Sequence, residues 1–385
     1  MVDRKLDQSD KSGHIPSGRS DGFLSGALPS DVRVRNRTAI LRALYSGERL
    51  SRAELAKVTG ISKVSTSDVV SDLMSDGYLR ELGYKSSARR GKPALMLEFD
   101  PTAKAVIGVD LSESHEIKGV VSDLKGTILH RESLSLADGQ WLGINQVVTL
   151  CEALMADNDL PLLGLGVATP GFVDSNGVVI EAPLLGWKDV DIVGKLESRL
   201  GCYVYASNDA DCGVFAERSF AAGPPSMMFV QIAKGVGAGL LVSDAVVRGI
   251  GNTAGEIGHV VVDPDGPECV CGKRGCLETI IAAPVLDRQI TAWPERREEV
   301  IGHAGEVLGR ALAMVVAMTD ITDVTVAGPE NLVDAHFCLA AQNQVNRLVH
   351  SRFIDEIVVH GPHLKEDTSV LGAVANVLRS KLNLL

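Results

Sequence analysis

Three cysteines within eight positions constrain this chain more than any other sequence feature. Cys269, Cys271 and Cys276 are interleaved with glycines, and His259 precedes them at loop distance. One imidazole and three thiolates supply the four ligands of a closed tetrahedral zinc site, with no position left for an activated water. Unrelated buried cysteines are the alternative, but they rarely crowd in this way. The pattern therefore predicts a zinc knuckle that is structural rather than catalytic.

Charge is spread unevenly along the 385 residues. Residues 33–92 contain 13 Lys and Arg against 6 Asp and Glu, whereas the whole chain has a formal net charge of −11. A chain this acidic cannot be a general polycation that coats nucleic acid. A basic segment on an acidic body indicates a DNA-binding head attached to a domain with another task.

The sequence has no feature of secretion or membrane insertion that we recognise. The first 20 residues are polar and lack the apolar core of a signal peptide. The longest apolar runs are shorter than the roughly 20 residues that a membrane span needs. We therefore expect a cytoplasmic protein with no membrane partner.

Residues 33–100 show the layout of a winged helix-turn-helix. A helical pattern begins near Arg33, and Ser51 and Ser62 each precede a further short helix as capping residues. Two apolar strand-like segments then enclose a basic tip. The polar residues 1–32 show no periodicity, and we expect them to form a disordered arm.

The third helix and the basic tip are the predicted DNA-binding elements. Val64 is expected to face the core of the head. A solvated loop is the alternative for the basic tip, but its place beside a helix-turn-helix favours contact with a DNA groove. The residues predicted to reach phosphates or base edges are Lys63, Ser65, Ser67, Arg89, Arg90 and Lys92.

After Asp100-Pro101 the chain alternates strands and helices, which predicts an α/β body of two lobes with a cleft between them. Its motifs resemble those of the ROK family of repressors, open reading frames and sugar kinases. The segment Gly164–Asp174 is similar to the family's sugar-site strand and loop, and Asn208–Asp211 to its catalytic-aspartate segment. The resemblance covers almost the whole chain. It implies a winged helix-turn-helix followed by an actin-like, RNase H-like body with a zinc knuckle over residues 101–385.

The resemblance also implies a polar cage for a sugar. Its histidine would serve twice, with one ring nitrogen on zinc and the other directed at the ligand, as a metal-bound imidazole can do. The residues that correspond to the cage are Asn208, Asp209, Glu256, His259 and Glu278.

The nucleotide half of the site departs from the family pattern. ROK kinases carry a glycine-rich phosphate loop where this chain has Asp110-Leu111-Ser112-Glu113. A carboxylate and missing glycines oppose the close approach of phosphate oxygens. The resemblance thus implies a regulator without a catalytic residue, in which Asp209 is a vestigial base.

The predicted function is a sugar-responsive DNA-binding regulator, a repressor of genes for carbohydrate uptake or metabolism. Its partners would be a double-stranded DNA operator and a sugar or sugar phosphate, and it would act as a homodimer or homotetramer. The alternative is an ATP-dependent ROK sugar kinase with a DNA-binding head, in which Asp209 would be the catalytic base.

Overall fold

A computed structural model describes residues 29–84, 94–113, 115–137 and 141–384. Most of the predicted arm lies outside these ranges, as do three of the predicted DNA-binding residues, Arg89, Arg90 and Lys92.

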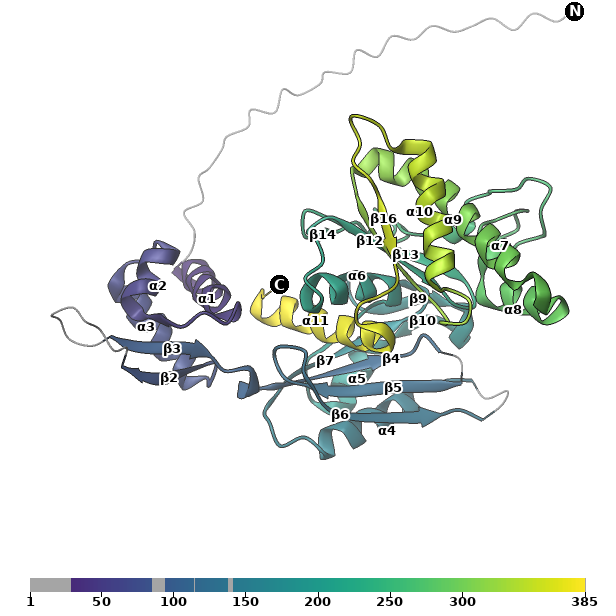
Figure 1. The fold of residues 1–385 in the computed structure, drawn as a ribbon. Coiled ribbons are helices and arrows are strands. Elements are labelled where there is room, and N and C mark those ends of the chain that lie inside the picture. Colours follow the sequence, from purple (N-terminus) through teal and green to yellow (C-terminus); the bar gives the residue numbers. More distant parts are fainter. Residues whose placement is uncertain (1–28, 85–93, 114, 138–140, 385) are drawn as a thin grey trace, which may run out of the picture.

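The head has three helices and a small antiparallel sheet of strand order β1-β3-β2 (Figure 1). Its first helix begins at Pro29, ahead of the predicted boundary at Arg33. The elements are α1 (Pro29–Tyr45), β1 (Leu50–Ser51), α2 (Arg52–Thr59), α3 (Lys63–Ser75), β2 (Leu79–Tyr84) and β3 (Leu95–Phe99).

Local capping sets the helix boundaries in the head. The Ser51 hydroxyl accepts a hydrogen bond from the Glu54 amide, and the Glu54 carboxylate accepts one from the Ser51 amide. This capping box satisfies backbone donors that the helix itself cannot. Helix α2 ends at Gly60, which takes a left-handed conformation with φ of 71°. Ser62 then caps α3 by accepting from the Ser65 amide.

The body consists of two lobes whose five-stranded sheets repeat one topology. Lobe I has the strand order β11-β7-β4-β5-β6, and lobe II has β14-β13-β12-β15-β16. In each, three consecutive strands form an antiparallel meander, and two later strands add in parallel on the other side of the first. The predicted pair of α/β lobes is therefore confirmed, with a stricter internal repeat than the sequence indicated.

Lobe I is built from β4 (Ala105–Asp110), β5 (Glu116–Ser122), β6 (Ile128–Ser135), α4 (Ile144–Ala156), β7 (Leu162–Thr169), α5 (Ile192–Leu200) and β11 (Val204–Asn208). A further small sheet, absent from the sequence prediction, contains β8 (Phe172–Val173), β9 (Val178–Ala182) and β10 (Trp187–Asp191). This sheet extends the predicted sugar-site loop outward from the end of β7.

Lobe II is built from β12 (Met227–Ile232), β13 (Val236–Val242), β14 (Ala245–Val246), α7 (Glu278–Ile281), α8 (Ala283–Ala292), α9 (Arg297–Thr319), β15 (Asp323–Ala327), α10 (Ala335–Val349) and β16 (Val358–His360). Two crossover helices connect the lobes, α6 (Asp209–Phe220) and α11 (Thr368–Leu382).

Helix α11 is pressed against the sheet of lobe I and against α6 (Figure 1). A Cβ on Gly166 of β7 would lie 2.1 Å from the Ala373 carbonyl oxygen. A Cβ on Gly372 would lie 2.0 Å from the Cys212 carbonyl oxygen. Both glycines are therefore required by close backbone approach.

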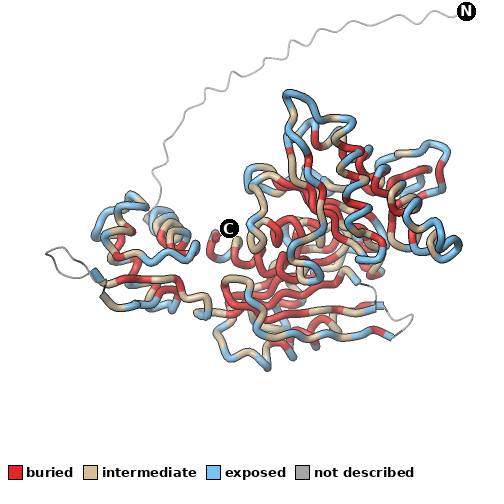
Figure 2. The backbone as a smooth tube through the Cα atoms, in the orientation of Figure 1, coloured by how far each residue is buried: buried red, intermediate tan, exposed pale blue. Residues whose placement is uncertain are grey.

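The end of α11 and lobe I both contact the head. The Arg42 guanidinium of α1 donates to the Asn383 carbonyl at 2.9 Å. The Tyr45 hydroxyl donates to the Leu124 carbonyl of lobe I at 2.9 Å. Buried side chains of the head and of α11 belong to one apolar cluster. Figure 2 shows buried segments inside the head and both lobes.

One helical segment, Pro294–Thr319, is long and apolar enough to cross a membrane by length and composition. Glu306 and Arg310 interrupt this segment, so it is not one of the uninterrupted apolar runs that the sequence prediction concerned. Its side chains such as Ile301, Leu308 and Leu312 are buried in the core of lobe II, and α9 packs against α10. A buried core helix of a folded domain can have the length and apolar composition of a membrane-spanning helix.

Candidate functional site

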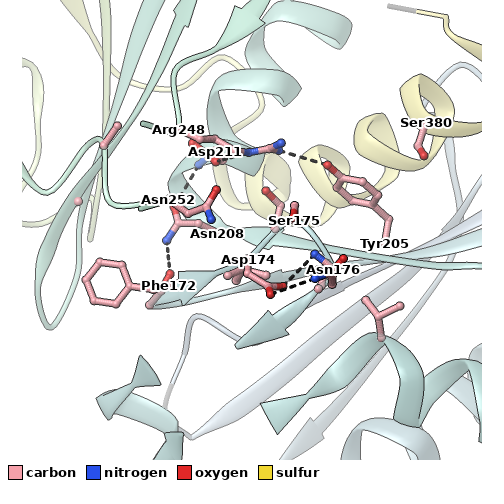
Figure 3. A pocket seen from close by; sticks show the side chains of 18 of the residues that line it. Phe172, Asp174, Ser175, Asn176, Tyr205, Asn208, Asp211, Arg248, Asn252 and Ser380 are labelled. Atoms are coloured by element: carbon pink, nitrogen blue, oxygen red, sulfur yellow. Dashed lines mark hydrogen bonds and ion pairs between the residues drawn. The ribbon is translucent and has the colours of Figure 1, made fainter. Parts of the chain in front are cut away.

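A cavity of about 360 Å³ lies between the β8–β9 turn, the end of β11, the start of β13 and helix α11 (Figure 3). Both lobes contribute to it. Its polar lining is Asp174, Ser175, Asn176, Tyr205, Ser207, Asn208, Asp211, Arg248, Asn252, Glu256 and Ser380. Hydroxyl, amide and charged groups thus converge on one hollow, which is the pattern of a site for a small polar ligand.

Asn208 stands at the junction of β11 and α6. Its side-chain oxygen accepts hydrogen bonds from the Ala210 and Asp211 amides, at 2.9 and 3.2 Å, and so caps α6. Its side-chain nitrogen donates to the Gly171 carbonyl at 2.9 Å. The side chain is thereby fixed in orientation, with a second N–H available for a ligand.

Asp209 follows in the first turn of α6. Burial, together with the nearby carboxylates of Asp110 and Asp211, raises its pKa to about 7 against the opposing effect of the backbone amides. Asp110 itself is buried at the end of β4, and burial raises its pKa. The carboxylate of Asp110 at the end of β4 therefore disfavours the ionisation of Asp209 in the first turn of α6.

Arg248, from the loop after β14, reaches across the cavity. Its guanidinium donates to the Tyr205 hydroxyl at 3.2 Å and lies 3.5 Å from the Asp211 carboxylate (Figure 3). Burial raises the pKa of Asp211 to about 6, although Arg248 opposes the shift. Sequence analysis missed this trio, because no local spacing connects three residues that only the lobe arrangement brings together.

The four predicted metal ligands do converge. The ligand atoms of His259, Cys269, Cys271 and Cys276 all lie within 4.8 Å of one another. The Cys271 and Cys276 sulfur atoms are 3.6 Å apart, and Cys269 Sγ is 3.5 Å from His259 Nδ1. A compact set of one nitrogen and three sulfur donors fits a tetrahedral metal ion of the zinc type.

The predicted sugar cage is only partly assembled around the cavity. Asn208 and Glu256 line it, whereas Asp209, His259 and Glu278 do not. A chain of contacts nevertheless leads from the cavity to the cysteine cluster. His259 Nε2 lies 4.0 Å from the Glu256 carboxylate, and His259 Nδ1 lies 3.3 Å from Glu278.

The Nδ1 atom of His259 thus faces both the sulfur of Cys269 and the carboxylate of Glu278. The Cys269 thiol also donates to Glu278 at 3.0 Å. Glu278 therefore contacts two members of the cluster and sits directly beside it, in the position of a group that orients metal ligands.

The described residues of the hairpin between β4 and β5 form local polar contacts. The Ser112 amide donates to the Asp110 carboxylate at 2.9 Å, and the Glu113 carboxylate accepts from Lys118 Nζ at 2.6 Å. The loop is therefore acidic and its polar groups are engaged internally. The Gly235–Gly239 segment runs into strand β13 (Val236–Val242), where Gly239 passes close to the start of α6.

The exposed face of α3 carries the described part of the DNA-binding prediction. Lys63 is exposed, whereas Ser65 and Ser67 are half-buried and the Ser65 hydroxyl bonds to Ser62. The prediction that Val64 faces the core was wrong, since its side chain is 72% exposed. The α3 face turned to the core instead uses Thr66, Val69, Val70 and Leu73.

Comparison with known proteins supports this division into head and body. The ROK family profile matches residues 106–380, and a winged helix-turn-helix DNA-binding profile matches residues 35–80. The xylose repressor of Bacillus subtilis (strain 168) is 30% identical over 262 residues, which are 66% of this chain and 67% of that protein.

Two solved structures share the fold. A ROK family transcriptional regulator homologous to the Escherichia coli MLC protein superposes with a TM-score of 0.79 and 19% identity, covering 91% of this chain and 96% of that one. A ROK family glucokinase from Streptomyces griseus, in complex with glucose and AMPPNP, gives a TM-score of 0.62 and 22% identity, covering 72% and 99%. The extra length of the present chain relative to the kinase is consistent with its head. From its body profile, its head and its two-lobed fold, we conclude that this chain belongs to the ROK family.

Proposed function

We propose that the protein is a sugar-responsive repressor of transcription that controls genes for carbohydrate uptake or metabolism. The observation that carries the proposal is the polar cavity between the lobes, on a chain that also has a winged helix-turn-helix. A ligand that touches both lobes stabilises their closed arrangement, and only such a difference in affinity can shift the conformational equilibrium. The effector would be a sugar or a sugar phosphate.

Within the cavity, Asn208 and Glu256 are the proposed hydrogen-bonding partners of the sugar hydroxyls. Asp209, His259 and Glu278 would join them on lobe closure, as the family resemblance implies. Asp209 is the residue best placed to follow, because it is adjacent to Asn208 at the start of α6.

DNA binding is proposed for the exposed start of α3 and for the wing. Lys63 would contact a phosphate, and Ser65 and Ser67 would reach phosphate or base edges. The exposed Val64 adds an apolar group that can contact a thymine methyl in the major groove. Arg89, Arg90 and Lys92 of the wing are proposed to enter a groove of the operator.

For the cysteine cluster we propose one structural Zn²⁺ per chain, held by His259, Cys269, Cys271 and Cys276. When bound, the ion would supply folding free energy to the loop between β14 and α7. The chain's own contribution is to fix the ligands, with Glu278 against His259 and Cys269.

Kinase activity is the alternative that the family allows. It needs a loop whose backbone amides cradle phosphates. In this chain the corresponding hairpin presents Glu113, and its neighbour Asp110 already accepts the Ser112 amide. We therefore propose a regulator without catalysis, in which Asp209 has lost its role as a base.

We further propose a cytoplasmic homodimer or homotetramer. The domain limits would be 1–32 for the arm, 33–100 for the head and 101–385 for the body, with α1 extending the head back to Pro29. A single recognition helix reads few base pairs, so paired heads on a two-fold symmetric operator would supply the missing specificity.

The deciding experiment measures operator affinity of the full chain with and without each sugar of a panel, after the operator has been selected from random DNA. A cognate sugar should change operator affinity by about 5–150-fold, the usual range of allosteric coupling. The variant Asp209→Asn should bind DNA normally but lose most of this response. If ADP release with any sugar of the panel reaches kinase-like turnover, the kinase alternative replaces this proposal.

A further inference from the structure

A second cavity, of about 320 Å³, lies between α11, α6 and the β14 segment. It shares Tyr205, Arg248 and Ser380 with the cavity described above. The two hollows therefore adjoin each other at these residues. The proposed role of the second hollow rests on the proposed function, since it extends the proposed sugar cavity.

Two arginines from different lobes give the second cavity its chemistry. Arg248 comes from the loop after β14 of lobe II, and Arg379 comes from the last turn of α11. The guanidinium carbon of Arg379 lies over the Phe215 ring, 4.6 Å from its centre. No ion pair of Arg379 occurs among the residues that the structure describes.

The nearby acids Asp211 and Asp244 pair with Arg248 and Arg218, so neither of them neutralises Arg379. Asp211 faces Arg248 at 3.5 Å, and Asp244 is held by Arg218 at 2.5 Å. Burial lowers the pKa of Arg379, and the nearby guanidinium group of Arg248 acts in the same direction, whereas Tyr205 and Asp244 oppose the shift. Positive charge is thus in excess on one wall of the hollow.

Hydrogen-bond donors complete the wall. The Tyr205 hydroxyl accepts from Arg248, which leaves its own proton free to point at a ligand. The Asn376 amide at the base of the hollow contacts only the sulfur of Cys212, at 3.4 Å, among the contacts of the described chain. Guanidinium groups and hydroxyl donors that line a cavity with excess positive charge are the arrangement that binds a phosphoryl group.

We infer that this second cavity binds the phosphoryl group of a phosphorylated sugar, with Arg379 and Arg248 as its ligands and the sugar ring in the adjoining cavity. The effector is therefore a sugar phosphate rather than a free sugar. An anion held between the two arginines ties lobe II to α11. Because Asn383, directly after α11, accepts a hydrogen bond from Arg42 of the head, the site lies next to the contact between body and head.

The first test is a calorimetric titration of the full chain with inorganic phosphate at constant ionic strength. Chloride is the reference anion. Phosphate should bind at millimolar concentration, and Arg379→Met should weaken it by about tenfold, as expected for loss of a charge-assisted hydrogen bond. Methionine keeps an apolar stem over Phe215. Arg379→Lys should restore part of the affinity, and Arg288→Gln on the exposed face of α8 should change nothing.

The second test compares sugars with their own phosphates, namely glucose, N-acetylglucosamine and xylose against their terminal monophosphates. At least one phosphate should bind about tenfold more tightly than its parent sugar, and Arg379→Met should remove that difference while leaving the parent sugar's affinity unchanged.

The outcomes separate cleanly. Phosphate binding that is absent, or equal in wild type and Arg379→Met, overturns the anion site. Binding of inorganic phosphate without any preference for a sugar phosphate shows a free-anion site and overturns the effector assignment. A free sugar that binds and alters operator affinity, while its phosphate does not, supports the proposed function and refutes this inference. If DNA binding responds to no sugar and no sugar phosphate, the proposed function itself fails.

Discussion

The two lobes share one strand order but differ in the hairpin between their first two strands. In lobe I the hairpin after β4 carries Glu113, which Lys118 holds at 2.6 Å. In lobe II the hairpin after β12 is small and open, and a Cβ on Gly235 would meet only the Glu278 carboxylate, at 3.4 Å. The repeated topology gives both hairpins the same place in their sheets, but their side-chain chemistry differs.

The two lobes also differ in the structure that supports each of them. The loop between β14 and α7 of lobe II contains the cysteine cluster and Glu256, and Glu256 lines the cavity. Lobe I is backed by α11, whose backbone lies directly on the sheet at Gly166. Lobe II therefore depends on a metal-organised loop, and lobe I depends on close helix–sheet packing. Each prediction below tests one side of that contrast.

The largest effect is expected from Cys276→Ser in lobe II. Its thiol is buried within the cluster, so the variant should lose the metal and more than about 4 kcal/mol of the free energy of unfolding. Elemental analysis and urea denaturation measure both changes. Cys202→Ser in lobe I, outside the cluster, is the matched control and should keep one zinc per chain. A Cys276→Ser protein with full zinc content would contradict the ligand assignment.

Gly166→Ala tests the packing of lobe I. The new Cβ would meet the Ala373 carbonyl at 2.1 Å, so α11 must shift, and stability should fall by about 3 kcal/mol. Gly361→Ala, in the loop after β16, has no atom within 4 Å of its new Cβ and should stay within about 0.5 kcal/mol of wild type. Equal denaturation midpoints for the two variants would show that α11 does not need this close approach.

Asp209→Asn tests the acidic pair beside the cavity. Because the folded pKa of Asp209 is raised to about 7, the folded state binds an extra proton between about pH 4 and 7, and stability falls as pH rises through that window. In the variant, the free energy of unfolding should depend less on pH across this window. At pH 8 it should exceed that of wild type by about 1 kcal/mol or more. Urea denaturation at pH 5 and pH 8 measures it. The exposed Asp287→Asn on α8 is the control, and a slope unchanged in Asp209→Asn would refute the argument.

The smallest effect is expected from Glu113→Gln in the lobe I hairpin. The Glu113–Lys118 pair is exposed, so its loss should change stability by less than about 0.5 kcal/mol. Removing one charge does not supply the missing glycines, so binding of AMPPNP with Mg²⁺ should remain undetectable by calorimetry. Nucleotide binding by this single variant would mean that charge alone separates the hairpin from a phosphate loop.

Much of the architecture could be predicted from the sequence because it depends on short-range patterns. The helix caps at Ser51 and Ser62 are confirmed, and so is the alternation of strands and helices that predicts two α/β lobes. The interpretation failed where a residue's surroundings come from distant segments. Val64 has a helical spacing that suits a core position, yet its side chain is not covered by any part of the chain that the structure describes.

The candidate site divides in the same way. The metal ligands were found because a metal needs particular donor atoms close together in the chain, and that requirement is visible as spacing. Arg248, Tyr205 and Ser380 carry no such signal, and the predicted cage residues Asp209, His259 and Glu278 proved not to line the cavity.

The sequence by itself determined the family, the helix caps and the four donors of the cysteine cluster, since each rests on interactions within a few residues. Only the tertiary structure decided which polar groups meet at the cleft. Residues 205, 248 and 380 lie on a strand, a loop and the last helix, and the return of α11 to lobe I is what brings them together. That placement follows from the burial of apolar surface and from close backbone packing at glycines. Both effects act on the whole fold, so they produce no local sequence pattern around residues 205, 248 and 380.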